Sequence, residues 1–125
     1  MTNFILTLAL LMPVSTPLSE EGCLAKIMFA ESRGESIEGA IAVGQAAVNR
    51  AKRTGKTICK LTGVSRLTPP RNLRSHYKAL AKSVIHGKDS IVQNSDSWNT
   101  GTKPKYAGAI VRQIGDHVFY VMSRL

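Results

Sequence analysis

The chain has 125 residues, which suits one domain with a single hydrophobic core and leaves no room for a second. Hydrophobic residues make up 43% and charged residues 20% of the chain, a composition that excludes an intrinsically disordered protein. Lys and Arg number 17 against 8 Asp and Glu, so the net charge of +9 favours a polyanionic partner such as nucleic acid, anionic lipid or a bacterial envelope.

The first element in chain order is an apolar run at residues 4–12. It is too short to cross a bilayer as a helix, and it matches the hydrophobic region of a secretory signal, although no Lys or Arg precedes it. The alternative is an apolar segment packed on the domain. We therefore divide the chain into residues 1–16, a signal or apolar N-terminal segment, and residues 17–125, the folded domain, and we expect export to the periplasm or the cell exterior.

A first helix is predicted to begin at Thr16 and to end at residue 32 or 33. Thr16 is a suitable N-cap, Pro17 suits the first helical position, and acidic side chains at 20 and 21 favour the positive end of the helix dipole. Gly34 is the predicted stop.

Glu31 continues the predicted inward face of this helix, beyond an apolar stripe formed by Leu24, Ile27 and Met28. Loss of solvation at the end of such a stripe is expected to raise the pKa of the Glu31 carboxyl group. A carboxyl group that holds its proton near neutral pH can donate it to a leaving oxygen, as a glycosidase acid must. The structural alternative is an inward ion pair with an arginine, for which the candidates are Arg33 and Arg50.

A second helix is predicted from Ser36, a suitable N-cap, to Gly55, a suitable stop. One of its faces is apolar and made of small residues, so another helix can pack very close to it. The members of this face are Ala40, Val43, Gly44, Ala47, Val48 and Ala51.

Loop signals fill residues 57–71, and a third helix is predicted from an N-cap at Asn72 to Gly87. Its other side carries a basic row at i, i+4 and i+8, which is either a solvated face or a contact surface for an anionic partner. The row consists of Arg74, Lys78 and Lys82.

The polar stretch 89–106 is predicted to be irregular, and a β-hairpin is predicted around Gly115-Asp116, with glycine at the first turn position as a type II′ turn requires. The expected architecture is therefore mostly helical with one small β-hairpin near the C-terminus.

Two motifs stand near the two ends of the predicted domain: Ala-Glu-Ser-Arg-Gly-Glu at 30–35 and Arg-Gln-Ile-Gly-Asp-His-Val-Phe-Tyr at 112–120. Between them lie Glu38-Gly39, then Ala-Val-Gly-Gln-Ala-Ala-Val-Asn-Arg at 42–50, then Thr57-Ile58-Cys59. In this order and spacing the segments resemble the SleB-type cell wall hydrolases, a family found in bacteria and phages, over roughly residues 20–122.

The resemblance implies a mostly α (α+β), lysozyme-like fold of the goose-type transglycosylase kind. It implies cleavage of the β-1,4 bond between N-acetylmuramic acid (MurNAc) and N-acetylglucosamine (GlcNAc) in peptidoglycan. The family's catalytic glutamate falls on Glu31. We expect a lytic transglycosylase with one catalytic carboxyl group, because no second carboxylate is clearly poised; the alternative is a muramidase-type hydrolase of the same bond.

Supporting or substrate-binding roles are expected for residues that also admit structural explanations. Glu35 is expected to be a second carboxylate of the site, and the alternative is that it forms an ion pair or caps a helix. Gln45 and Asn49 are expected to bind the acetamido groups of the sugars or to hold the Glu31 side chain in position. The alternative is that they form hydrogen bonds between the second helix and a loop. Asp96 lies in the polar loop and is the other candidate for a second carboxylate.

Aromatic and histidine side chains complete the expected site. Trp98 and Tyr106 can stack on sugar rings, although a tryptophan can also simply anchor its loop. His117, beside the hairpin turn, is more often structural, satisfying a backbone group, than catalytic. Cys23 and Cys59 are expected to form a disulfide in an exported chain, the alternative being two buried free thiols.

Other classes of function have less support. The sequence has no nucleophile-elbow, phosphate-loop or dinucleotide motif, and its Cys and His residues lack the spacing of a zinc site, so no metal and no cofactor is expected. The expected partners are peptidoglycan and the anionic envelope surface, with a monomeric protein and no nucleic acid. The runner-up from a different class is a non-enzymatic basic module that binds envelope or nucleic acid.

Overall fold

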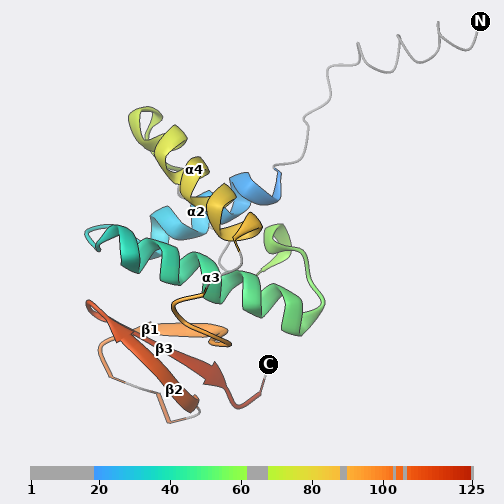
Figure 1. The fold of residues 1–125 in the computed structure, drawn as a ribbon, viewed down its shortest axis with the longest axis vertical. Helices are drawn as coiled ribbons and strands as arrows, with labels where there is room; N and C mark the ends of the chain where they lie inside the picture. Colours follow the sequence, from blue (N-terminus) through green and yellow to red (C-terminus); the bar gives the residue numbers. More distant parts are fainter. Residues whose placement is uncertain (1–18, 62–67, 88–89, 103, 106, 125) are drawn as a thin grey trace, which may run out of the picture.

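The computed structural model describes residues 19–61, 68–87, 90–102, 104–105 and 107–124. Within these residues, three α-helices pack together on one side of a three-stranded antiparallel sheet, and α3 runs between the other two helices and the sheet (Figure 1). The expected N-terminal segment 1–16 lies outside the described residues. In the part of the chain described, no helix has the length and apolar character needed to cross a membrane.

Helix α2 spans Glu20–Ser32, so the predicted start at Thr16 is wrong. The N-cap is Ser19, whose side-chain oxygen accepts a hydrogen bond from the Gly22 backbone N–H at 3.1 Å. This cap places both glutamates in the first turn of the helix, where the dipole favours them. The predicted stop is confirmed, because Gly34 adopts a positive φ of 80° directly after the helix.

Helix α3 spans Ile37–Thr54 and has the predicted boundaries. Ser36 accepts from the Gly39 N–H at 3.1 Å, and Gly55 caps the other end. The predicted close helix packing is confirmed at Gly44, where an added Cβ would lie 2.9 Å from Met28 Sδ on α2. A larger residue at this position would require the Met28 side chain to move.

Helix α4 spans Arg74–His86 and ends before Gly87 as predicted. Its predicted N-cap is wrong, because Asn72 lies inside the 3₁₀ helix η2, Arg71–Leu73, which leads directly into α4. A second 3₁₀ helix, η1, occupies Ile58–Lys60 in the segment predicted as loop.

The sheet consists of β1 (Ser97–Thr100), β2 (Ala107–Ile114) and β3 (His117–Met122) in the order β1-β3-β2. The predicted hairpin is confirmed, with a positive φ of 57° at Gly115 and none at Asp116, as in a type II′ turn. The prediction of an irregular segment is wrong for residues 97–100, because their backbone pairs with β3 and extends the hairpin to three strands.

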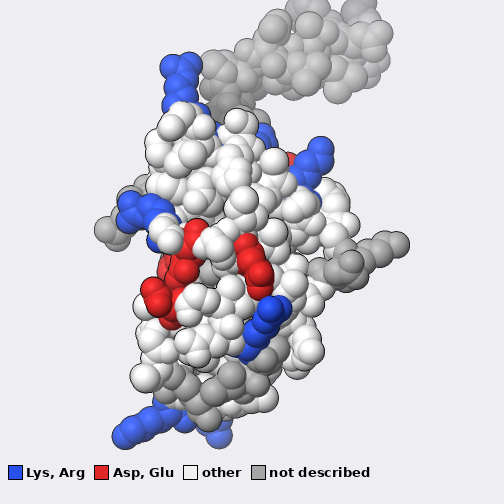
Figure 2. Space-filling model, turned by 60° about the vertical axis from the view of Figure 1, so that its left-hand side comes forward, with Lys and Arg blue, Asp and Glu red and all other residues white. Residues whose placement is uncertain are grey.

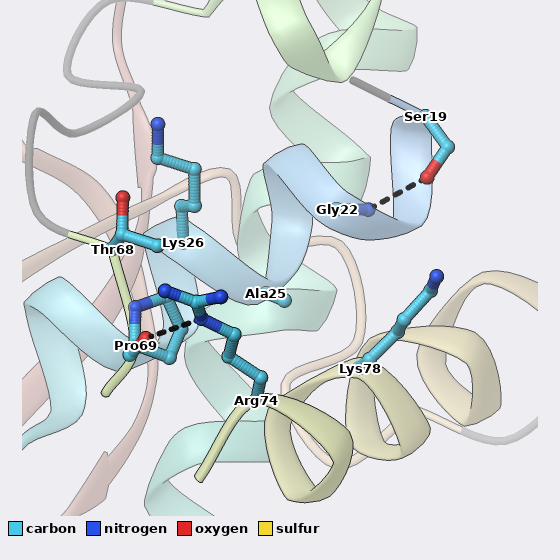
Figure 3. Close-up of a pocket in the computed structure, with 8 residues that line it drawn as sticks. All are labelled: Ser19, Gly22, Ala25, Lys26, Thr68, Pro69, Arg74 and Lys78. Atoms are coloured by element: carbon cyan, nitrogen blue, oxygen red, sulfur yellow. Dashed lines mark hydrogen bonds between the residues drawn. The ribbon is translucent and has the colours of Figure 1, made fainter. Parts of the chain in front are cut away.

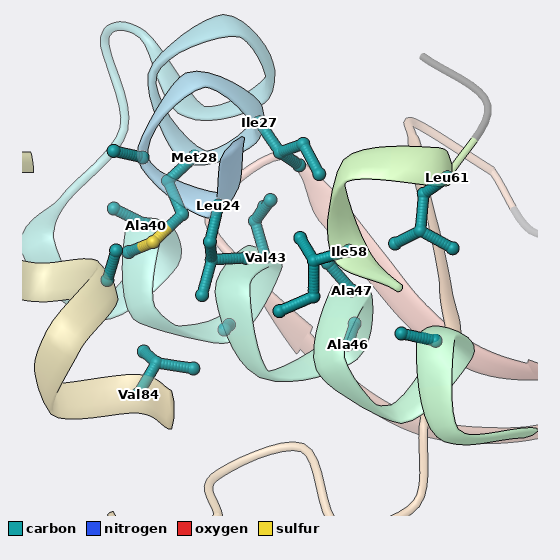
Figure 4. Close-up of a cluster of buried hydrophobic side chains, with 14 of the residues drawn as sticks. Leu24, Ile27, Met28, Ala40, Val43, Ala46, Ala47, Ile58, Leu61 and Val84 are labelled. Atoms are coloured by element: carbon teal, nitrogen blue, oxygen red, sulfur yellow. The ribbon is translucent and has the colours of Figure 1, made fainter. Parts of the chain in front are cut away.

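The hydrophobic core lies where α2, α3 and α4 meet (Figure 4). Small side chains on α3 allow larger ones from α2 to enter between the helices. Leu24, Met28, Val43 and Phe119 are fully buried, the last reaching the core from β3.

A disulfide joins Cys23 on α2 to Cys59 in η1 across a sequence separation of 36 residues. The backbone N–H of Ile58 also donates to Glu20 Oε2 at 2.7 Å, so η1 is held to α2 twice. We expect Cys23→Ser/Cys59→Ser to lower the free energy of unfolding by roughly 2–4 kcal/mol, because the unfolded chain gains freedom. Urea unfolding of oxidised, reduced and mutant protein measures this, and equal midpoints for all three would contradict it.

Candidate active site

Glu31 lies in the last turn of α2, and its side chain is exposed. The three stripe residues before it, Leu24, Ile27 and Met28, are buried as predicted. The stripe therefore reaches the edge of the core before Glu31, and the expected burial of this carboxyl group is wrong. The structural alternative, an ion pair with Arg33 or Arg50, is not found, because no ion pair among the described residues includes Glu31. The guanidinium of Arg33 instead lies 5.3 Å from the centroid of the Phe29 ring.

Glu35 follows the turn after α2 and contacts the tip of the β2–β3 hairpin. Its side chain is only 16% exposed, and Oε1 accepts from the Asp116 backbone N–H at 3.3 Å. Gly115 packs so closely that an added Cβ would lie 2.4 Å from Glu35 Oε2. The hydrogen bond joins residues 81 positions apart, and both contacts fix the connection between α2 and α3 against the sheet.

His117 is buried beside the same carboxylate. Nδ1 lies 3.3 Å from Glu35 Oε1, close enough for an ion pair when the imidazole is protonated. Its direction does not meet hydrogen-bond geometry, so Nδ1 is a buried nitrogen without a hydrogen-bond partner among the described residues. Within the described residues, the charged neighbour of Nδ1 is therefore the Glu35 carboxylate, and no backbone group bonds to this nitrogen. The structure therefore brings together His117 and Glu35, the second glutamate of the 30–35 motif. The side chain of Glu31, four residues before Glu35, is exposed.

Acidic side chains gather around a hollow on the face formed by the end of α2, the start of α3 and the hairpin turn (Figure 2). These elements carry Glu31, Glu35, Glu38 and Asp116. Glu38 pairs with Arg112 of β2 at 3.1 Å, and both side chains are about half exposed. This face is therefore acidic in a chain whose net charge is +9.

Gln45 and Asn49 of α3 bond the helix to the segment before β1. Gln45 Oε1 accepts from the Ile91 N–H at 2.8 Å, and Asn49 Nδ2 donates to the carbonyl oxygens of Gln93 and Ser95, both at 2.8 Å. The structure thus contains the helix-to-loop bonds that were the structural alternative for both side chains. These side chains support the sheet's position against α3.

Asp96 is 1% exposed and fully engaged. Its carboxylate pairs with Arg53 in the last turn of α3 and accepts from the Met122 N–H at 2.8 Å and the Ser97 hydroxyl at 3.0 Å. Arg53 lies in the last turn of the 18-residue helix α3, which is ~27 Å long at 1.5 Å per residue, whereas Glu35 lies two residues before the first residue of this helix, Ile37. The Asp96 carboxylate is therefore bonded at the end of α3 that is remote from Glu35, where it joins this helix to the sheet.

Of the two aromatic residues expected at the site, the structure describes one. Trp98 is partly buried in β1 and packs against the hydrophobic core, which is the anchoring alternative. Tyr106 lies outside the described residues. Within the described parts of the chain, no group of three or more His, Cys, Asp or Glu side chains is placed to hold a metal ion.

No protein-family model and no curated protein matches this sequence. Among solved structures, the chain is similar to the catalytic domain of the Bacillus cereus SleB protein, with 22% identity and a TM-score of 0.61 over 87% of this chain and 96% of that one. It is also similar to the catalytic domain of the germination-specific lytic transglycosylase SleB from Bacillus anthracis, with 21% identity and a TM-score of 0.61 over 86% of this chain and 99% of that one. The fold is that of these domains, and the predicted mostly helical α+β class is confirmed.

Proposed function

We propose that this protein cleaves peptidoglycan glycan strands at the β-1,4 bond between MurNAc and GlcNAc, with Glu31 as the general acid. The observation that carries the proposal is the position of Glu31, an exposed carboxyl group at the end of α2 on an acidic, hollowed face. The fold supports it, because one similar structure is described as a lytic transglycosylase and both as catalytic domains.

The reaction is proposed to be a transglycosylation. Hydrolysis by the common routes needs a second carboxylate, ~5 Å away for retention or ~6.5–9.5 Å for inversion. Two candidates named from the sequence have other partners: Glu35 contacts the hairpin, and Asp96 pairs with Arg53. Glu38, also nearby, pairs with Arg112.

One carboxyl group suffices for the proposed chemistry. Glu31 gives its proton to the glycosidic oxygen as the bond from that oxygen to C1 of MurNAc breaks. The C6 hydroxyl of the same sugar then attacks C1, and its proton passes to the Glu31 carboxylate. The products are a GlcNAc end with a free hydroxyl and a 1,6-anhydroMurNAc end, and no water is consumed.

Mass spectrometry of unreduced muropeptides after digestion tests this proposal. We expect products about 18 mass units, one water, below those of a muramidase, and no uptake of ¹⁸O from labelled water. Reducing ends that carry ¹⁸O would make the protein a hydrolase, and the second carboxylate would then be sought among the acidic residues of the hollow. Absence of any soluble muropeptide would contradict the enzymatic function itself.

Export is proposed for the same protein. A disulfide such as Cys23–Cys59 persists in oxidising compartments, which include the periplasm and the cell exterior. The protein is proposed to act there as a monomer on peptidoglycan, whether encoded by a cell or by a phage. The competing function, a basic module that binds nucleic acid, rests on the net charge of +9. Zymography on peptidoglycan and a salt-dependent DNA shift assay separate the two.

A further inference from the structure

A groove between the first half of α2 and the start of α4 gathers three basic side chains, here called the groove cations: Lys26, Arg74 and Lys78. Lys26 extends from α2, and the other two extend from successive turns of α4 (Figure 3). Ala25 and Pro69 also line the groove, but both residues are buried. The cavity measures ≈ 210 Å³, whereas one water molecule needs only about 10–15 Å³, so the groove can hold a group of many atoms.

The groove cations have no acidic partner among the described residues. The two glutamates in the first turn of α2 have other contacts. Glu20 accepts from the Ile58 N–H at 2.7 Å, and Glu21 Oε1 lies 3.6 Å from His86 Nε2. The positive charge of the groove is therefore not balanced by the nearest acidic side chains of the same helix.

Arg74 is partly fixed before any ligand binds. Its Nε donates to the Pro69 carbonyl oxygen at 3.1 Å, which orients the guanidinium at the groove wall (Figure 3). The two terminal nitrogens form no hydrogen bond within the described structure. A fixed planar guanidinium suits two oxygens of one phosphate group, and the flexible lysines add charge on either side.

We propose that this groove binds the phosphodiester groups of an anionic wall polymer, a chain of alternating phosphates and short polyols. The three cations pair with successive phosphates of the polymer. The proposal rests on the function proposed above and names a second partner for it. Lys26 and Glu31 are five residues apart on α2, which places them about 140° apart around the helix axis, so a polymer held in the groove leaves Glu31 free for the glycan.

Binding to purified cell walls tests the proposal. The ligand-bearing probe is a wall that carries poly(glycerol phosphate), and the reference is the same wall stripped of that polymer with hydrofluoric acid. We expect Lys26→Gln/Lys78→Gln to bind the phosphate-bearing wall ~5-fold more weakly at low ionic strength, and to differ little from wild type on stripped walls. Arg74 is kept in this variant, because it also holds Pro69.

A matched control is Lys60→Gln/Lys105→Gln, which removes the same charge from exposed lysines that do not line the groove. It is expected to bind as wild type does. Equal weakening by both double variants would show a general charge effect and overturn the proposal. Equal binding of wild type to stripped and phosphate-bearing walls would also overturn it.

Competition distinguishes a polymer from a simple phosphate. Soluble oligo(glycerol phosphate) is expected to displace the protein at a phosphate concentration where inorganic phosphate does not, and equal displacement by both would contradict polymer binding. Cleavage of soluble glycan strands free of wall polymer is measured in parallel and is expected to be the same for all variants. Failure of wild type to cleave them would count against the proposed enzyme activity, whereas the wall-binding result would stand on its own.

Discussion

Glu31→Gln is expected to reduce the rate of glycan cleavage by ~10²-fold or more while the protein stays folded. Glutamine preserves the size of the side chain but supplies neither the acidic proton for the leaving oxygen nor the carboxylate that later accepts one. Because Glu31 is exposed and forms no ion pair within the described residues, stability should change by no more than about 0.5 kcal/mol.

Clearing of a peptidoglycan suspension measures the rate, and circular dichroism with urea unfolding measures the fold. The matched control is Glu21→Gln, the same substitution at the other end of α2, which is expected to keep full activity. A folded Glu31→Gln protein with more than about a tenth of wild-type activity would remove Glu31 from the mechanism and leave the fold assignment untouched.

The helices were largely predictable because their signals are local. Ser36 and Gly55 bound α3 where the sequence places them, since a cap bonds only to residues three or four positions away. Gly44 likewise predicted the close packing of α2 and α3, because small residues at helical spacing form a face against which another helix can pack closely. Ser19 was missed in favour of Thr16-Pro17, an equally good cap signal three residues earlier.

The site was less predictable, because its geometry depends on contacts between distant segments. Periodicity placed Glu31 on the inward face of α2, but it cannot tell where along the helix the core ends, and the structure leaves this residue exposed. The Glu35 contact with Asp116 spans 81 residues, and no local pattern reports it. A usable signal was present in Gly115, whose positive φ and close approach to Glu35 explain a glycine at that turn.

The polar segment before the hairpin gave the most misleading signal. A run of Asn, Ser and Asp is typical of exposed loops, yet Ser95, Asp96 and Ser97 are all buried. Burial is possible there because Arg53 and the backbone of β3 satisfy the Asp96 carboxylate. The groups that satisfy Asp96 lie 26 and 43 positions away in the sequence. Composition alone therefore indicated a site residue, whereas in the structure Asp96 connects α3 to the sheet.

Asp96→Ala is expected to lower the free energy of unfolding by about 3–4 kcal/mol, within the range of roughly 3–5 kcal/mol for breaking a buried ion pair. The substitution leaves the Met122 N–H and the Ser97 hydroxyl without their acceptor. The loss stays in the lower part of that range because the Arg53 side chain is 37% exposed and its charge remains hydrated. Urea unfolding gives the value, with Asp116→Ala as an exposed aspartate control expected to change stability by less than about 0.5 kcal/mol.

A double-mutant cycle with Arg53→Ala separates the ion pair from the other bonds of Asp96. If the ion pair contributes to stability, the sum of the two single-variant losses in unfolding free energy will exceed the loss in the double variant, because each single variant removes the same interaction. Glu31 stays in place in every variant, so the proposed reaction should survive in whatever fraction remains folded. A loss below about 1 kcal/mol for Asp96→Ala would show that Asp96 does not hold the sheet against α3, and a catalytic explanation for this carboxylate would then be reopened.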